Sequence, residues 1–240
     1  MMDRMRTWSW KRWLAIAVVV GAIAALGGPF VYIHFVQGKA PAPLALTTPA
    51  ASSSATQAAT STSQASGATD GAWNVGSDSI VGYRIKEVLF GQSNVAVGRT
   101  SDITGSITVA GTTISVGSFT VDMTTVTSDE SRRDGQFIGR IMETSTYPTA
   151  TFTLTQPIDF GQVPSIGVKQ AFQATGELTL HGVTKPVTFQ VTGQYTGSTV
   201  QVVGSIPVTF ADYDISNPSF GPVSTEDHGI LEFSLNFAHA

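Results

Sequence analysis

Histidines and carboxylates are the side chains in this sequence whose types could support metal binding or acid–base chemistry. His181 and His228 each precede a glycine, and Glu226 and Asp227 lie just before the second histidine. A metal site would require both histidines to meet a carboxylate in space, because the sequence contains no short ligand spacing. A turn histidine and a polar loop histidine explain the same pattern. We favour that explanation and predict neither a metal nor another cofactor.

Four carboxylates near the middle of the chain could form a pair for general acid–base catalysis: Asp122, Asp129, Glu130 and Asp134. They lie close to three arginines, namely Arg132, Arg133 and Arg140. Carboxylates beside arginines more often form ion pairs and helix caps than catalytic pairs, so we predict a structural role. A hydrolase with a carboxylate pair near Asp134 is a remote alternative, and the sequence contains no nucleophile elbow, zinc-protease motif or phosphate-binding loop.

The composition narrows the fold class. Among the 240 residues, 42% are hydrophobic, only 12% are charged, 24 are glycine and none is cysteine. A charged fraction about half the usual value disfavours a coiled coil and charged disorder. The absence of cysteine excludes disulfides, a cysteine zinc site and a thiol nucleophile.

Charge is distributed unevenly along the chain. Residues 1–36 carry four basic side chains and one acidic side chain, a net charge of +3, whereas residues 73–240 carry eight basic and fifteen acidic side chains, a net charge of −7. Nucleic-acid phosphates require a basic surface on the protein. The acidic C-terminal part therefore excludes nucleic acid as a partner.

A single membrane-spanning helix is predicted over residues 13–36, which contain no Asp, Glu, Lys or Arg. At about 1.5 Å per residue, 24 residues exceed the roughly 30 Å hydrocarbon core of a bilayer. Four basic residues precede this run, so we expect residues 1–12 in the cytoplasm and the rest of the protein outside the cytoplasmic membrane.

A cleaved signal peptide followed by secretion is the alternative. Ala22-Ile23-Ala24 resembles a small-x-small cleavage site, and the basic N-terminus fits a signal peptide. However, the apolar run continues to Val36, which is longer than the usual 7–15 residues of a signal sequence. We therefore favour the uncleaved anchor.

Residues 37–72 read as a disordered linker rich in Ala, Ser, Thr and Pro. The segment lacks apolar periodicity, so it cannot bury enough surface to offset the entropy lost on ordering. A flexible chain of this length typically reaches about 30–35 Å, which predicts a tether between the membrane and the domain that follows.

Residues 73–240 form one domain in which apolar and polar residues alternate with the period of β-strands. Val81, Tyr83 and Ile85 share one face of a strand, and near the C-terminus Leu231 and every second residue to Phe237 do the same. About eight or nine such segments, separated by turn residues, predict an all-β closed barrel or a sandwich.

Two local features interrupt the strands. His181-Gly182 and Lys185-Pro186 mark the connection of the clearest hairpin, and Gly182 is expected to adopt a positive φ. Residues 127–148 contain a short helical insert, where Thr127 and Glu130 have the spacing of a capping box. The insert would lie across one end of the sheet.

The domain resembles the YceI family of lipid- or polyisoprenoid-binding proteins. The resemblance extends from Trp73 to Ala240 and depends on several segments in order: Trp73-Asn74-Val75, Ser79 to Tyr83, Val97-Gly98, Ile103 to Gly105, Phe119 to Asp122, Ser131 to Asp134, Tyr147 to Phe152, and Ala174 to Val187. It implies an eight-stranded antiparallel lipocalin-like barrel, here preceded by the membrane helix and linker. The apolar interior of such a barrel would hold a long isoprenoid chain.

The predicted ligand-binding residues are the inward side chains of the strands together with the apolar residues of the insert: Val121, Met123, Phe152, Leu154, Phe172, Phe189 and Phe233 in the walls, and Phe137, Ile138 and Ile141 over the opening. The sequence thus favours a membrane-tethered, non-enzymatic protein that binds an isoprenoid lipid of the quinone or polyprenyl type. An envelope structural or stress-protective protein, with a barrel filled by its own side chains, is the alternative.

Overall fold

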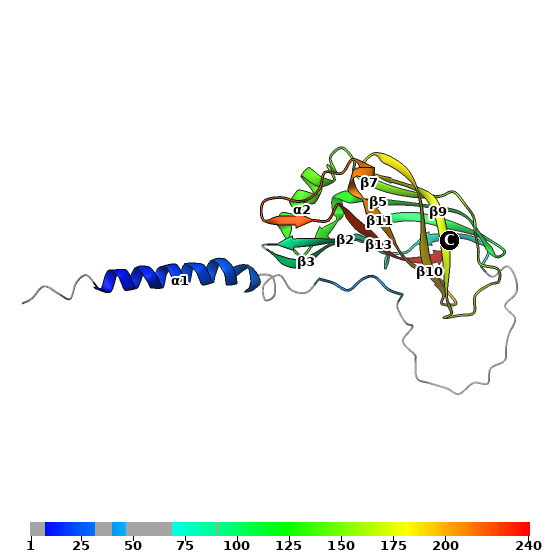
Figure 1. Ribbon diagram of the computed structural model, residues 1–240. Helices are drawn as coiled ribbons and strands as arrows, with labels where there is room; N and C mark the ends of the chain where they lie inside the picture. Colours follow the sequence, from blue (N-terminus) through cyan, green and yellow to red (C-terminus); the bar gives the residue numbers. More distant parts are fainter. Residues whose placement is uncertain (1–7, 32–39, 47–68, 90) are drawn as a thin grey trace, which may run out of the picture.

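The computed structural model describes residues 8–31, 40–46, 69–89 and 91–240 (Figure 1). The chain begins with helix α1 (Trp8–Val31), which Figure 1 shows apart from the β domain. No helix in the described part of the chain has both the length and the apolar character needed to cross a membrane. The predicted span over residues 13–36 is therefore not confirmed, and its last five residues lie outside the described ranges.

Eight antiparallel strands close into a barrel, as the sequence resemblance predicts. In ring order they are β1 (Gly71–Val75), β4 (Ile103–Ala110), β5 (Thr113–Asp122), β7 (Thr149–Leu154), β9 (Lys169–Leu180), β10 (Val183–Tyr195), β11 (Thr199–Thr209) and β13 (His228–His239). The ring closes where Val75 of β1 pairs with Phe237 of β13. Closure removes the exposed sheet edges that an open sheet would leave.

A second set of strands widens one end of the barrel. The first half of β13 pairs with β2 (Ile80–Leu89), which continues the sheet to β3 (Gln92–Thr100) and to the short β6 (Thr127–Ser128). β12 (Val223–Thr225) pairs with the last residues of β2, on the same edge as β13, and β8 (Ile158–Asp159) pairs with β5. Strand β13 thus pairs along one edge with two strands: with β2 through its first half and with β1 through its last residues.

The alternation read from the sequence determines which side chains enter the core. On β13, Phe233, Leu235 and Phe237 are buried inside the barrel, and Val81 of β2 joins the same core. Glu232 lies on the outer face, as the alternation predicts, yet it is only 4% exposed because other polar side chains cover it. Burying these apolar side chains supplies most of the driving force for closing the barrel.

The β9–β10 hairpin is tighter than predicted. His181 and Gly182 alone form its turn, with φ of 51° and 76°, and Leu180 pairs directly with Val183. Two successive positive φ values are typical of the turn that matches the twist of antiparallel strands. Lys185 and Pro186 belong to β10 and not to the connection, which corrects the sequence-based expectation. β11 pairs with β10 only from Val191 onward, so Pro186 lies beside an open strand edge.

The predicted helical insert exists and has an unusual second half. Helix α2 (Ser131–Gln136) continues into a π-helical turn, η3 (Phe137–Ile141), in which Met142 N donates to the Phe137 carbonyl at 2.8 Å. The expected capping box is wrong, because Thr127 pairs with Arg99 in the β3–β6 ladder. Glu130 caps the helix instead by accepting a hydrogen bond from Arg132 N.

Part of the predicted linker has a defined place. Residues 40–46 lie against the outside of the barrel, where Arg84 and Arg99 donate hydrogen bonds to the carbonyls of Pro41 and Ala42. β1 already begins at Gly71. The disordered linker over residues 37–72 stays a prediction, because residues 40–46 have no regular secondary structure and residues 37–39 and 47–68 lie outside the described part of the chain.

Candidate ligand-binding cavity

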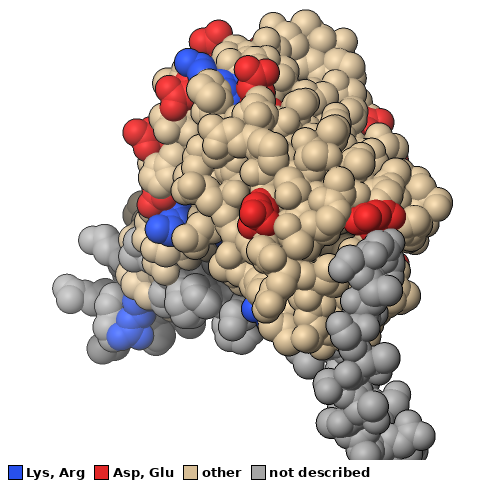
Figure 2. All heavy atoms as spheres, turned by 90° about the vertical axis from the view of Figure 1, so that its right-hand side faces the viewer, with Lys and Arg blue, Asp and Glu red and all other residues tan. Residues whose placement is uncertain are grey.

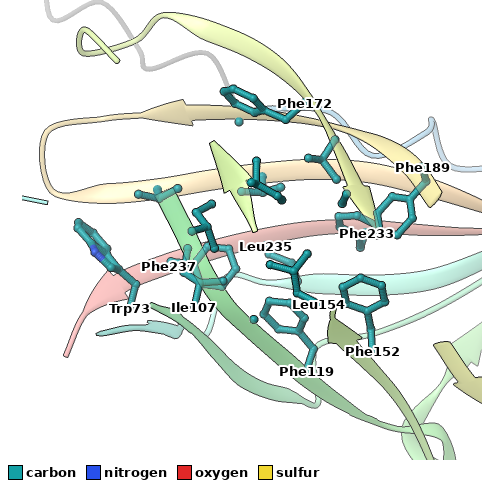
Figure 3. Close-up of a pocket in the computed structure, with 18 of the residues that line it drawn as sticks. Trp73, Ile107, Phe119, Phe152, Leu154, Phe172, Phe189, Phe233, Leu235 and Phe237 are labelled. Carbon is teal, nitrogen blue, oxygen red and sulfur yellow. The ribbon is translucent and has the colours of Figure 1, made fainter. Parts of the chain in front are cut away.

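A narrow apolar cavity of about 190 Å³ runs inside the eight-stranded ring. Figure 3 shows aromatic and aliphatic side chains pointing into it from several strands: Trp73, Ile107, Phe119, Phe152, Leu154, Phe172, Phe189, Phe233, Leu235 and Phe237. These inward residues come from strands that are far apart in the sequence. The wall offers apolar contact along its length and very few polar groups.

Trp73 occupies one end of the narrow cavity (Figure 3). Its ring packs edge-on against Tyr195 and His239, with centroid distances of 6.3 and 4.9 Å. The indole N–H donates to the Thr69 carbonyl at 2.9 Å, so burying this polar group leaves no unmet hydrogen bond. Trp73 is 2% exposed and closes this part of the barrel interior.

Five phenylalanine rings contact one another in a continuous series along the wall. Phe119 lies 5.8 Å from Phe237 and 6.4 Å from Phe152, measured between ring centroids. Phe152 then meets Phe189 edge-on at 5.4 Å, and Phe189 meets Phe233 in the same way at 5.9 Å. The Phe152–Phe189 and Phe189–Phe233 contacts have the edge-to-face geometry that aromatic pairs prefer, which helps to hold these rings in place.

A wider cavity of about 770 Å³ lies between β2, the helical insert and η4 (Phe210–Tyr213). Its apolar lining includes Tyr83, Phe137, Ile141, Met142 and Phe210. Four residues line both cavities, namely Val81, Val121, Ala150 and Leu231. The two cavities therefore lie next to each other along the barrel, with these four side chains between them.

Charged side chains line the wider cavity and not the narrow one. Glu87, Glu130, Arg132, Arg133 and Gln136 belong to the lining of the wider cavity. Arg133 donates to Glu87 at 3.2 Å and also pairs with Asp129. Burial alone would lower the pKa of Arg133, but these two carboxylates outweigh it and raise the pKa, so the guanidinium remains charged.

The opposite end of the barrel has a different surface. Figure 2 shows that end, where uncharged residues cover most of the face and both acidic and basic side chains are scattered over it. The two arginines that line a cavity, Arg132 and Arg133, belong to the end that carries the helical insert. An anionic or polar group would find partners there and not along the narrow cavity.

The structure places nine of the ten predicted ligand-binding residues in a cavity wall. Phe152, Leu154, Phe172, Phe189 and Phe233 line the narrow cavity. Val121 lines both cavities, and Met123, Phe137 and Ile141 line the wider one. Whether these side chains contact a ligand stays a prediction.

Ile138 is the exception. It belongs to neither lining and is 37% exposed. In an α-helix Ile138 and Met142, four residues apart, would share a face. The π-helical turn changes this register, because its hydrogen bonds span five residues. As a result Phe137, Ile141 and Met142 face inward, and Ile138 faces solvent.

Several wall residues were missed in the sequence. Trp73, Phe119, Leu235 and Phe237 line the narrow cavity, and Tyr83 lines the wider one. The alternation on the strands already put Tyr83, Leu235 and Phe237 on the inner face. Trp73 carried no such signal, because its position depends on where β1 closes the ring.

The two domain histidines lie in separate environments. His181 is buried in the β9–β10 turn, with Nδ1 3.2 Å from the Tyr213 carbonyl. His228 is exposed beside Asp227 and Glu226, at 2.8 and 3.2 Å. Within the described residues, no three metal-ligating side chains converge.

The carboxylates of the insert are occupied as caps and ion partners. Asp134 accepts hydrogen bonds from both the backbone N and the Oγ of Ser128, at 2.8 and 2.6 Å. Asp122 caps a short helical turn, and its hydrogen bonds from Thr124 lower the pKa of this carboxyl. Arg140, predicted to pair with a carboxylate, donates instead to Gln136 Oε1 and the Pro218 carbonyl.

Comparison with known proteins matches the β domain as a unit. A family model described as the YceI-like domain covers residues 73–237. Two UPF0312 proteins, from Vibrio parahaemolyticus and Vibrio campbellii, are each 32% identical over 114 residues, which is 45% of this chain and 56% of theirs. The chain thus spans about half the length of these curated relatives.

A solved structure shows the same fold. A polyisoprenoid-binding domain from Saccharophagus degradans, implicated in plant cell wall breakdown, superimposes with a TM-score of 0.57 at 20% identity, covering 70% of this chain and 98% of that one. BcnA of Burkholderia cenocepacia gives a TM-score of 0.48 at 21% identity, with 64% and 95% coverage.

Proposed function

The chain belongs to the family of YceI-like domains, and we propose on this basis that its barrel is a binding protein for a long isoprenoid lipid of the quinone or polyprenyl type. The domain from Saccharophagus degradans, which has the same fold, is described as polyisoprenoid-binding. We further propose that the protein acts by binding alone, without catalysing a reaction on its ligand.

The observation that carries this proposal is the pair of neighbouring cavities, one narrow and apolar and one wider and largely apolar. Small-molecule pockets usually have volumes of about 300–1,000 Å³, so the wider cavity has an ordinary size. The narrow one suits only a slender chain. A barrel filled by its own side chains, as a purely structural protein would have, leaves no such space.

Burial of an apolar tail would supply ample binding energy. At about 25 cal/mol per Å², removing some 400 Å² of tail from water gains on the order of 10 kcal/mol before the cost of ordering the chain. Few polar contacts are then needed for affinity. This matches a cavity whose inner half is lined almost entirely by hydrocarbon.

The distribution of polar groups suggests an orientation for the lipid. We propose that the tail enters the narrow cavity and that the head group remains in the wider one, near Arg132 and Arg133. Arg133 is already paired with Glu87 and Asp129. Arg132 lies on the exposed side of the insert, where it can approach a polar or anionic head group.

Extraction of the purified protein with organic solvent, followed by mass spectrometry, tests this function. We expect an isoprenoid lipid in near-stoichiometric amount from the intact protein and none from the urea-unfolded protein after washing. Recovery of ordinary phospholipid alone, or of no lipid, would contradict the proposal.

We also propose that residues 13–36 anchor the protein in the cytoplasmic membrane, with residues 73–240 outside. The support is the uncharged run of 24 residues preceded by four basic side chains. Protease added to intact spheroplasts should then remove the β domain and leave the anchor in the membrane. A protected domain would refute the orientation, and a mature protein beginning near Ala25 would refute the anchor.

A further inference from the structure

A short stretch of the segment between α1 and the barrel is bound to the barrel wall. Arg84 Nη2 donates to the Pro41 carbonyl at 2.8 Å, and Arg99 Nη2 donates to the Ala42 carbonyl at 2.6 Å. Leu44 and Leu46 of the same stretch are half-buried. We call residues 40–46 the docked segment.

The surface that receives the docked segment is a pre-formed charge cluster. Glu232 of β13 accepts from Arg84 Nε at 3.2 Å and from Arg99 Nη2 at 2.7 Å. The Glu232 side chain is 5% exposed, so its pairing with the two guanidinium groups is well shielded from water. Each arginine has five N–H donors and therefore keeps donors for the carbonyls of the docked segment.

The composition of the docked segment suits this contact. Pro41 and Pro43 alternate with alanine, and each proline restricts its own φ and the conformation of the residue before it. An extended chain of this kind has no internal hydrogen bonds, so its carbonyls are available to external donors. It also loses less entropy on binding than a glycine-rich chain would.

We propose that the docked segment attaches the chain to the outer face of β2 and β3 and so shortens the tether between α1 and the β domain. Val31 ends α1 and Ala40 begins the docked segment, so the nine intervening steps along the chain can span at most about 30 Å in any conformation. Without docking, the 38 steps from Val31 to Thr69 could extend to about 130 Å. Docking therefore reduces the maximum reach about fourfold.

The position of the attachment gives the shortened tether a consequence for ligand entry. Arg84 lies on β2 between Tyr83 and Ile85, whose side chains line the wider cavity. The docked segment thus limits how far the wall of the wider cavity can move away from α1. The opposite end of the barrel, near Trp73, can move farther from α1. This consequence rests on the proposed anchor and lipid ligand, because only a membrane-embedded α1 would keep the cavity near its lipid source.

The first experiment measures docking itself in the full-length protein. The chain has no cysteine, so a thiol-reactive spin label attaches only to cysteines that are introduced. We introduce two, Ala45→Cys in the docked segment and Glu177→Cys on the outside of β9. We expect one narrow distance distribution by pulsed electron paramagnetic resonance. Replacing the other residues of 40–46 with Gly and Ser should broaden it at least twofold, whereas the same replacement at residues 50–56 should not.

The second experiment measures the tether in nanodiscs containing the full-length protein. A donor dye at Ser93→Cys on β3 and an acceptor on lipid head groups report the distance of the barrel from the bilayer. Energy transfer should fall by at least about half when residues 40–46 are replaced, and remain unchanged when residues 50–56 are replaced.

Three results would overturn the proposal: a broad distance distribution in the unmodified segment, equal energy transfer in the two replacement variants, or a full-length chain that does not stay in the nanodisc. Lipid extraction from the same samples judges the isoprenoid ligand separately. A protein that passes both distance tests but yields no isoprenoid would refute the proposed ligand and leave the shortened tether intact.

Discussion

Tyr83 and Phe137 show how single residues join the barrel to its helical insert. Their rings stack with centroids 5.0 Å apart and an interplanar angle of 16°. Phe137 is 7% exposed and belongs to the buried core, although it also lines the wider cavity. One side chain therefore serves both the stability of the fold and the shape of the cavity.

Tyr83 should make stability fall at alkaline pH. Burial raises the pKa of its hydroxyl far above the ordinary value of 10.0, and the nearby Arg133 offsets this only in part. Above about pH 10 the unfolded chain loses this proton while the folded protein keeps it, so the free energy of unfolding falls by up to about 1.4 kcal/mol per pH unit.

Tyr83→Phe should remove that part of the decline. Urea unfolding between pH 8 and pH 11 should show that the free energy of unfolding falls less steeply with pH in the variant. At pH 8 the two proteins should have nearly the same stability. Parallel limbs in the two proteins would mean that Tyr83 ionises as readily in the fold as in the unfolded chain.

Two features of the β9–β10 turn require a glycine at position 182: the positive φ of its backbone and the closeness of the Tyr147 ring. The φ of 76° at Gly182 disfavours any side chain, and an added Cβ would lie 2.5 Å from Tyr147 Cε1. Gly182→Val should therefore lower the free energy of unfolding by about 2 kcal/mol or more, measured by urea denaturation.

A second glycine provides the control for this substitution. Gly135 in α2 has open space around its Cβ position and a helical backbone. Gly135→Ala should be neutral or should stabilise by about 0.5–1 kcal/mol, because alanine has the higher helix propensity. Equal losses in the two variants would disprove the special role of the turn.

The helical insert forms one wall of the wider cavity. Helix α2 is held by its cap at Glu130, and Asp134 ties it to Ser128 in β6. The π-helical turn then directs Phe137, Ile141 and Met142 inward. The insert therefore contributes both to the core and to the wall of the wider cavity.

Two isoleucines on the turn η3 allow the role of the insert in binding to be tested. Ile141 lines the wider cavity, whereas Ile138 is exposed and lines neither cavity. Ile141→Asp should remove most of the co-purifying lipid, because an unpaired carboxylate in the wall disfavours an apolar ligand. Ile138→Asp should retain it.

Circular dichroism of both variants establishes whether the fold survives. If Ile141→Asp folds and keeps its lipid, the insert does not contribute to the binding cavity. If Ile138→Asp loses lipid to the same extent, the charge acts through the insert as a whole and not through the cavity wall.

At the scale of the whole molecule, ring closure produces the cavity. β13 pairs with β1 at one end and with β2 at the other, so the barrel is narrow around Trp73 and wide beneath the insert. In the proposed complex the narrow cavity would set how far the lipid tail can extend into the barrel. The length of the narrow cavity should therefore limit the length of the isoprenoid chain that the protein accepts.

Gly193 offers a way to shorten this space. It lines the narrow cavity next to Gln194 and Tyr195, and its added Cβ would meet no atom closer than 3.7 Å. Gly193→Leu should shift the extracted isoprenoids toward shorter chains, or reduce lipid content about twofold or more, without loss of fold. Mass spectrometry of the extract measures both effects.

An outward position on the same barrel serves as the control. Val116 on β5 is 55% exposed, so Val116→Phe adds bulk outside the cavity and should leave the extracted lipid unchanged. If Gly193→Leu and the unmodified protein yield the same chain lengths, the tail does not reach this part of the barrel.

The sequence alone determined the properties that depend on neighbouring residues. The period of two on β2 and β13 identified the strands and their inner faces, and His181-Gly182 marked a turn with positive φ. These features follow from local sterics and from the partition of apolar side chains, which a short stretch of chain already expresses.

The tertiary structure decided what depends on distant residues. Arg99 and Glu232 are 133 positions apart, and only the closed sheet brings them together with the carbonyls of residues 41 and 42. Trp73 reaches the cavity because β1 completes the ring, and Ile138 faces solvent because the insert contains a π-helical turn. Pattern in a single segment contains no information on these contacts, since their free energy arises from packing between elements that the chain brings together only on folding.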